Sequence, residues 1–282
     1  MGKTVIVTDS TAYIPAPLVK EYGIHVAPLT VIWGNEALHD GTEITPPEFY
    51  KRLKTAKVMP STSQTTPAEF KKEFTPIIEA GDSILAILIS SKLSGTVDSA
   101  VQAKAEFPNA QIEIVDTLTT AMALGYCALA AARAAKDGAG LADSAAVARK
   151  AVDSSGVIFV VDTLEFLRRG GRIGGAAAFI GTALNMKPLL TVKDGKVDAL
   201  DKVRTKGKAI ERMLDIVEER IGSRRPLRLA TLQAAAEDEA KALLETAGKR
   251  FHPEESVFSE VSPVIGTHVG PGTIGLAWCA GV

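Results

Sequence analysis

The segment most indicative of the fold class is Ser83-Ile84-Leu85-Ala86-Ile87-Leu88-Ile89, followed by Ser90-Ser91. A short run with apolar residues at successive positions is typical of a strand covered on both faces, as in the parallel sheets of α/β proteins. Three further runs have the same character, at residues 4–8, 112–115 and 157–161. The four runs together predict a mainly parallel sheet in the N-terminal half.

Helix start signals lie between these runs. Thr45-Pro46-Pro47-Glu48 and Thr66-Pro67-Ala68-Glu69 each combine a capping hydroxyl, a proline in the first turn and a glutamate three residues after the cap. Gly81 is a stop signal for the second helix. Strands that alternate with helices in this way indicate an α/β fold.

The second half of the chain has a different pattern. Asp194-Gly195 between two apolar runs predicts a tight hairpin, so antiparallel pairing is expected there. Further helices and strands are predicted at residues 206–221, 227–232, 237–247, 256–261 and 273–279. We therefore expect two α/β domains: residues 1–160 with a mainly parallel sheet, and residues 161–282 with a mixed or antiparallel sheet.

Composition excludes several classes of protein. The 282 residues are 46% hydrophobic and 23% charged with a net charge of −1, which is typical of a globular protein. The charge balance argues against a nucleic-acid binder and against a polybasic membrane patch. Cys127 and Cys279 have no metal-binding spacing, and we expect two buried thiols and no metal. The absence of a signal-like or membrane-spanning apolar run predicts a cytoplasmic protein.

Small polar residues follow the predicted strands, as in Asp9-Ser10-Thr11, Ser90-Ser91, Asp116-Thr117 and Asp162-Thr163. The carboxyl edge of an open α/β sheet is where ligands bind, so these side chains are candidates for a site. The same residue types also cap the helix that comes next, and the sequence leaves both interpretations open.

Two glycine-rich segments stand out. Residues 164–175 include Arg172 between glycine pairs and could hold an anion or act as a hinge between domains. Neither a phosphate-binding P-loop nor a dinucleotide-binding glycine pattern is present. Residues 266–273 set His268 between glycines, and we expect a loop that presents its imidazole.

Six blocks in this order resemble the signature blocks of the DegV family, which are bacterial fatty-acid-binding proteins. They are Thr8-Asp9-Ser10-Thr11, Ser61-Thr62-Ser63-Gln64, Ser90-Ser91-Lys92-Leu93-Ser94-Gly95-Thr96, Leu167-Arg168-Arg169-Gly170-Gly171-Arg172-Ile173, Leu184-Asn185-Met186-Lys187-Pro188-Leu189-Leu190 and Gly266-Thr267-His268-Val269-Gly270-Pro271-Gly272. The resemblance spans nearly the whole chain. Two departures, Thr65-Thr66-Pro67 and Val97-Asp98, bear on the preferred chain length more than on the fold.

The resemblance implies a long-chain fatty acid in a tunnel between two α/β domains. Its carboxylate would be held by Thr62, Ser94 and His268, with the adjoining Ser63, Gly95 and Thr267 grouped with them. Arg172 would lie near the tunnel mouth. Some family members present the bound acid to a fatty acid kinase, which places them in phospholipid metabolism. The implied protein is not an enzyme, has no cofactor and makes only transient contact with membranes.

The chemistry of this residue set can be assessed on its own. Two hydroxyls and an imidazole suit one carboxylate, and most of the affinity would come from burying the acyl chain. Ser94, His268 and Asp9 are also the residue types of a hydrolytic triad, so a serine hydrolase or esterase is the alternative. Ser94 lacks the Gly-x-Ser-x-Gly elbow of such enzymes.

Overall fold

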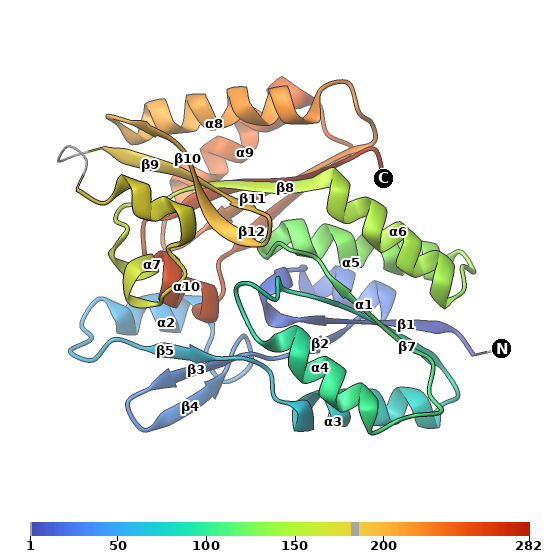
Figure 1. Cartoon of the computed structure of the whole chain (residues 1–282). Helices are drawn as coiled ribbons and strands as arrows, with labels where there is room; N and C mark the ends of the chain where they lie inside the picture. Colours follow the sequence, from blue (N-terminus) through green and yellow to red (C-terminus); the bar gives the residue numbers. More distant parts are fainter. Residues whose placement is uncertain (1, 182–185) are drawn as a thin grey trace.

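A computed structural model describes residues 2–181 and 186–282 of the chain. Its first sheet has the order β2-β1-β6-β7 and is parallel throughout. The strands are β1 (Thr4–Asp9), β2 (His25–Ala27), β6 (Ser83–Leu88) and β7 (Ile112–Asp116). Every residue of β6, the strand that the opening stretch predicts, is buried, because helices cover both faces of the sheet (Figure 1). The predicted parallel sheet is confirmed for three of its four runs.

The second sheet is mixed and has the order β10-β9-β8-β13-β11-β12. It consists of β8 (Ser155–Val160), β9 (Lys187–Lys193), β10 (Lys196–Val203), β11 (Leu227–Gln233), β12 (Glu255–Glu260) and β13 (Ile274–Ala280). The fourth apolar run, which the sequence assigned to the parallel sheet, forms β8 here and pairs antiparallel with β9 and β13. That assignment was wrong, because an apolar run shows that a strand is buried but not which strand it pairs with. The expected division at residue 160 falls at the end of this strand.

A small antiparallel sheet of order β4-β3-β5 was not predicted. Its strands are β3 (Thr30–Trp33), β4 (Glu36–His39) and β5 (Ser61–Ser63). They are short, and the polar sequence of β5 carries no apolar alternation that would indicate a strand. This sheet lies beside α2, at the side of the molecule where α7 and α10 also lie (Figure 1).

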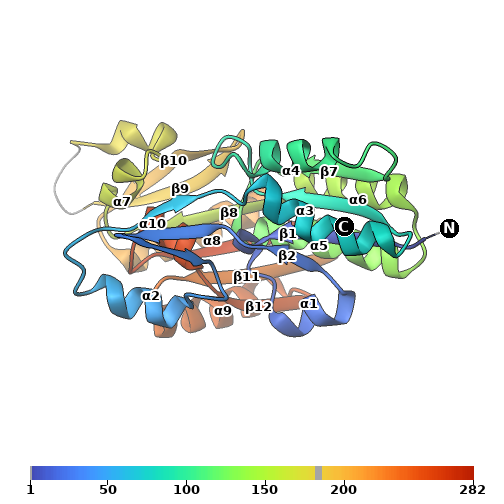
Figure 2. The same ribbon diagram turned by 90° about the horizontal axis from the view of Figure 1, so that it is seen from below.

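The helices form layers with the two large sheets (Figures 1 and 2). Helices α8 and α9 cover the outer face of the mixed sheet, and α3 and α4 cover the outer face of the parallel sheet. Helices α5 and α6 lie between the sheets. The bounds are α1 (Ala16–Tyr22), α2 (Pro46–Leu53), α3 (Pro67–Glu79), α4 (Thr96–Ala105), α5 (Ala121–Lys136), α6 (Leu141–Ser154), α7 (Glu165–Arg169), α8 (Lys206–Ile221), α9 (Glu237–Phe251) and α10 (Pro263–Val269), with 3-10 turns at Ser10–Ala12 and Gly174–Phe179.

Local sequence accounts for where several helices begin. The predicted capping boxes of α2 and α3 are both formed: Glu48 accepts from the backbone N–H of Thr45, and Glu69 from that of Thr66. Helix α3 ends at Glu79, two residues before Gly81. These contacts lie within one helical turn, which is why sequence alone predicts them.

Helix α5 is the centre of the core. It packs on β8 and β13 of the mixed sheet and on β1 of the parallel sheet. Every residue from 121 to 132 is buried, and many of them are alanine. A helix between two sheets has no solvent face, and small side chains let both sheets approach it.

The close approach to α5 is testable at Gly125. A Cβ atom there would lie 2.4 Å from the carbonyl oxygen of Ala12. Gly125→Ala should therefore lower the free energy of unfolding by about 1–3 kcal/mol, as overpacking does in other cores. Gly248 in α9 is the matched control, since a Cβ there meets nothing within 4 Å. Gly248→Ala should stabilise by about 0.5–1 kcal/mol. Urea unfolding measures both, and equal effects would contradict this packing.

Candidate functional site

A cavity of about 220 Å³ lies between the two large sheets, at the end where α5 begins. Its wall combines residues of both halves of the chain, such as Ile89 after β6 and Val192 in β9. Most of the lining side chains are apolar: Leu29, Ile89, Leu93, Ala121, Val157, Phe159, Leu167, Val192, Val197, Leu232, Val261, Val264, Ile265 and Val269. The expected ligand space between two α/β units is therefore present as a cavity.

Polar groups gather in one part of the wall. Thr62, Ser94, Arg172 and His268 all line the cavity. The Oγ1 atom of Thr62 lies 2.8 Å from Nε2 of His268, although 206 residues separate them in sequence. The Ser94 hydroxyl is 2.9 Å from that of Thr96 at the start of α4. Four residues that the sequence proposed from separate motifs thus share one site.

His268 lies in the last turn of α10, and not in the loop that the flanking glycines predicted. Pro263 begins this helix, and the glycine loop starts only at Gly270, where φ is 75°. The helix can approach its neighbours closely because Gly266 has no side chain: a Cβ there would lie 2.5 Å from the hydroxyl oxygen of Tyr50. The imidazole is therefore presented by a packed helix, which restricts its position more than a loop would.

The imidazole of His268 is buried, with 8% of the residue exposed. Burial, followed by the positive charge of Arg172, lowers the pKa of His268 to about 4. Its Nδ1 atom has no hydrogen-bond partner among the described residues, and a Cβ on Gly170 would lie 2.0 Å from it. A proton on Nδ1 would be unpaired, so we assign it to Nε2, which donates to Thr62. The Thr62 hydroxyl is then left to donate to a group in the cavity.

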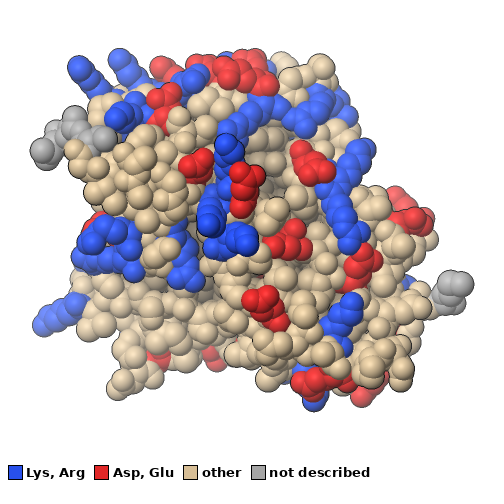
Figure 3. All heavy atoms as spheres, viewed as in Figure 1, with Lys and Arg blue, Asp and Glu red and all other residues tan. Residues whose placement is uncertain are grey.

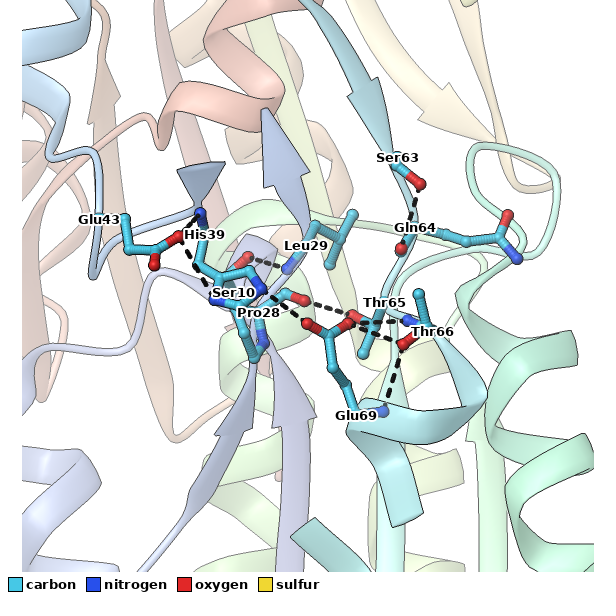
Figure 4. Close-up of polar contacts among 10 residues, drawn as sticks. All are labelled: Ser10, Pro28, Leu29, His39, Glu43, Ser63, Gln64, Thr65, Thr66 and Glu69. Atoms are coloured by element: carbon cyan, nitrogen blue, oxygen red, sulfur yellow. Dashed lines mark hydrogen bonds and ion pairs between the residues drawn. The ribbon is translucent and has the colours of Figure 1, made fainter. Parts of the chain in front are cut away.

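Contacts in the segment just after β5 hold the C-terminal end of this strand in place (Figure 4). The hydroxyl of Thr65 donates to the carbonyl of Pro28 at 2.9 Å. Glu69, which completes the capping box of α3, also accepts from Nε2 of His39 at 2.7 Å. Strand β5 is thereby anchored to the small sheet and to α3, and Thr62 is presented from a fixed backbone.

Asp40 holds α10 from its other end. Its carboxylate accepts from the backbone N–H of Val264, in the first turn of α10, at 3.3 Å, and from the Ser10 hydroxyl at 2.7 Å. An acceptor at this place satisfies a helical N–H that has no partner within the helix. Burial raises the pKa of Asp40 to about 6. Asp40 therefore positions His268 without lining the cavity.

Arg172 lies between α7 and the 3-10 turn at Gly174–Phe179, so helical turns occupy much of the segment in which the sequence suggested a hinge. Its Nε donates to the carbonyl of Leu93 at 3.0 Å, and its Nη1 donates to the carbonyl of Gly170 at 2.7 Å. No carboxylate forms an ion pair with it within residues 2–181 and 186–282. The guanidinium is the cationic group of the site, and it links the loop before α4 to the loop after α7.

Other predicted residues have different places. Ser63 lines the cavity, but Gly95 and Thr267 do not. The Thr267 hydroxyl donates to the carbonyl of Pro263 within α10. Gly95 makes room for Gln64, whose Oε1 would lie 2.1 Å from a Cβ at that position. Residues Leu184 and Asn185 of one signature block lie outside the described residues.

Sequence reasoning missed four polar residues of the cavity wall, namely Tyr13, Gln64, Thr120 and Thr273. The amide of Gln64 donates to the hydroxyl of Ser99 at 2.9 Å. Gln64 directly follows Ser63 in a quoted block, so its position was available as a signal. Tyr13 and Thr120 belong to no glycine-rich motif, and only the fold brings them to the cavity.

The geometry does not assemble a hydrolytic triad. His268 contacts Thr62 and not Ser94 through Nε2, and its Nδ1 atom has no carboxylate partner in the described part of the chain. Asp9 is buried and accepts from the backbone of Thr11 and from Ile89 N–H, at 3.0 and 2.7 Å. Asp9 thus caps the 3-10 turn at Ser10–Ala12, which is the structural role that the sequence left open for residues after the strands. It also ties the ends of β1 and β6 together.

Comparison with known proteins identifies the family. The DegV family profile matches residues 3–281. The chain belongs to the DegV family. A DegV domain-containing protein of Streptomyces coelicolor is 43% identical over 273 residues, which is 96% of each chain.

Solved structures of DegV proteins share this fold. A fatty-acid-binding DegV family protein of Thermus thermophilus superposes with a TM-score of 0.93 at 37% identity, over 99% of each chain. DegV of Bacillus subtilis, a fatty-acid-binding protein, superposes with a TM-score of 0.91 at 32% identity, over 99% of this chain and 100% of that one. In this DegV chain no helix among the described residues is long and apolar enough to cross a membrane.

The lowered pKa of His268 predicts a pH dependence of stability. Because its pKa falls from 6.5 in the unfolded chain to about 4 in the folded one, the neutral form favours folding. This contribution to the free energy of unfolding is fully present above about pH 6.5 and is lost as the pH falls towards 4. The total loss is about 3 kcal/mol. His268→Gln should remove it. Urea unfolding of the delipidated wild type and variant over a range of pH tests this, because the other three histidines are present in both proteins. Parallel curves of unfolding free energy against pH would refute the prediction.

Proposed function

We propose that this DegV family chain binds a long-chain fatty acid in the cavity between its sheets, with the carboxylate at Thr62, Ser94 and His268. One observation carries the proposal: hydroxyl donors and a neutral imidazole, beside one guanidinium, occupy part of a wall that is mostly apolar. The fatty-acid-binding relatives from Thermus thermophilus and Bacillus subtilis support it.

The charge of the site suits a single carboxylate. Arg172 is the one cation among the lining residues, and His268 stays neutral at physiological pH. A phosphate monoester would bring about two negative charges and would favour a more basic site. Each buried CH₂ of an acyl chain contributes about 0.8 kcal/mol before the ordering costs of binding, so the apolar wall supplies most of the affinity.

The carboxylate set is tested by three substitutions. Thr62→Ala, Ser94→Ala and His268→Ala should each weaken binding of hexadecanoic acid by about 1–3 kcal/mol, because each leaves a charged oxygen or a buried donor without its partner. Titration calorimetry on delipidated protein measures the dissociation constants. Thr246→Ala is the control, since the hydroxyl of Thr246 is exposed and bonds only within α9.

Unchanged dissociation constants in all three variants would refute the carboxylate assignment. Mass spectrometry of lipid extracted from denatured protein tests the ligand class separately. A purified protein that carries no fatty acid and binds none when it is added would refute the proposed function as a whole.

We further propose that the protein acts in the cytoplasm and presents the bound acid to a fatty acid kinase, which forms an acyl phosphate for phospholipid metabolism. Arg172 is the residue suited to this step. Two of its N–H groups are used on carbonyls, which leaves the rest of the guanidinium fork for an anion. Basic and acidic side chains are mixed over the face in Figure 3. We therefore expect a kinase to recognise individual side chains on this face, and not a large patch of one charge.

Arg172→Ala tests the handover. The variant should keep most of its fatty-acid affinity, because Thr62, Ser94 and His268 still contact the carboxylate in this proposal. It should nearly keep its melting temperature, because water can satisfy the two carbonyls that lose a donor. It should slow acyl phosphate formation in an assay reconstituted with a fatty acid kinase. Arg168→Ala is the control, since Arg168 is an exposed arginine of α7 paired with Glu165. A large fall in melting temperature with normal phosphorylation would show instead that Arg172 pins the two halves of the chain.

A further inference from the structure

The two hydroxyl donors of the proposed site lie on different elements. Thr62 is the middle residue of β5, and Ser94 lies two residues before α4. The backbone hydrogen bonds of β5 join it to β3, at the edge of the small sheet, and do not reach α4. Hydrogen bonds weaken steeply away from their preferred distance and angle, so one carboxylate can use both donors only if their spacing is fixed.

Gln64 makes the direct connection between these elements. Its Nε2 atom donates to the hydroxyl of Ser99, in the first turn of α4, at 2.9 Å. Its amide also lies against Gly95, where a Cβ atom would be 2.1 Å from Oε1 and 2.7 Å from Nε2. Ser99 is buried, and its backbone N–H donates to the carbonyl of Gly95. The side chain points away from the anchoring contacts of Thr65 and Glu69 and reaches the start of α4 instead (Figure 4).

This contact completes a ring of residues around the polar part of the cavity. Gln64 is two residues along the chain from Thr62, and Gly95 is the direct neighbour of Ser94. One side-chain contact, between Gln64 and Gly95, is therefore enough to join the two donors. Residues two apart in an extended segment face the same side, and both Thr62 and Gln64 line the cavity.

The other half of the ring is longer. Thr62 contacts Nε2 of His268, and the Nδ1 atom of this imidazole lies against Gly170. Arg172 then joins the carbonyl of Gly170 to that of Leu93, which directly precedes the second donor. This path runs through several separate contacts, so it restricts the spacing of the donors less than the direct contact does. Both paths enclose the same polar space.

We propose that Gln64 is a positioning residue, which fixes the spacing of the Thr62 and Ser94 hydroxyls and thereby selects a carboxylate over an uncharged head group. This inference rests on the proposed function, in which both hydroxyls donate to the bound acid. A carboxylate has two oxygens at a fixed separation, and each gains a charge-assisted hydrogen bond when both donors are in place. An alcohol has a single oxygen that either donor can satisfy alone, so its binding does not depend on their spacing.

The test compares hexadecanoic acid with hexadecan-1-ol, which have the same chain length and different head groups. Titration calorimetry on delipidated protein gives both dissociation constants. Gln64→Met keeps an unbranched side chain but removes its hydrogen bond, and Gly95→Ala displaces the amide from the other side of the contact. Each variant should weaken binding of the acid roughly three- to ten-fold and change binding of the alcohol by less than about two-fold.

Matched controls come from other positions in the chain. Gln102 is an exposed residue of α4 that does not line the cavity. A Cβ on Gly207, in α8, meets nothing within 4 Å. Gln102→Met and Gly207→Ala should therefore bind the acid and the alcohol as the wild type does.

A double-mutant cycle separates positioning from a merely structural role. In a Ser94→Ala background the pair of donors is already broken, so Gln64→Met should weaken acid binding further by less than about two-fold. Losses that simply add in the cycle, or equal losses for the acid and the alcohol in the single variants, would overturn the inference. If the wild type binds neither ligand, the proposed function itself fails.

Discussion

Helix α5 packs against both large sheets, and this packing fixes how the other elements are arranged. A helix buried on all sides must carry small side chains where the sheets approach it, and α5 does so over residues 121–132. Its close contacts, such as that of Gly125 with the carbonyl of Ala12, set how near the helix lies to the end of β1. The helix begins at the cavity, so its position also shapes the cavity wall.

The polar part of the cavity depends on close approaches between segments that are far apart in sequence. Gly170 lies against the imidazole of His268, and Gly266 lets α10 pack on Tyr50. Asp40 satisfies the first turn of α10 from the loop before α2. These contacts keep His268 and Thr62 within hydrogen-bond distance of each other. They also bury the imidazole, and burial lowers its pKa so that it stays neutral. The position of His268 and its neutral state thus have the same cause, which is the close packing of these segments around it.

The lining residues give the cavity a polar part and an apolar part. Neutral donors and one guanidinium suit a carboxylate, whereas the apolar wall suits an acyl chain. Strained backbone at Ala121 and Tyr13 lies in the cavity wall, and such strain is frequent at functional sites.

Local patterns in the sequence were sufficient for most of the elements. The capping boxes of α2 and α3, the Asp194-Gly195 hairpin and the buried strand β6 were all predicted correctly, because each depends on residues within a few positions of one another. The motif blocks likewise indicated Thr62, Ser94, Arg172 and His268, which the structure brings to one cavity. The family, and with it the fold class, could therefore be inferred before any coordinates were known.

Only the tertiary structure decided which strand pairs with which and what each side chain faces. An apolar run is equally compatible with either sheet, so β8 was assigned to the wrong one. The glycines around His268 resemble a loop, but packing against Tyr50 and the acceptor at Asp40 favour a helix. Such features arise from contacts over long sequence separations, which no local pattern encodes.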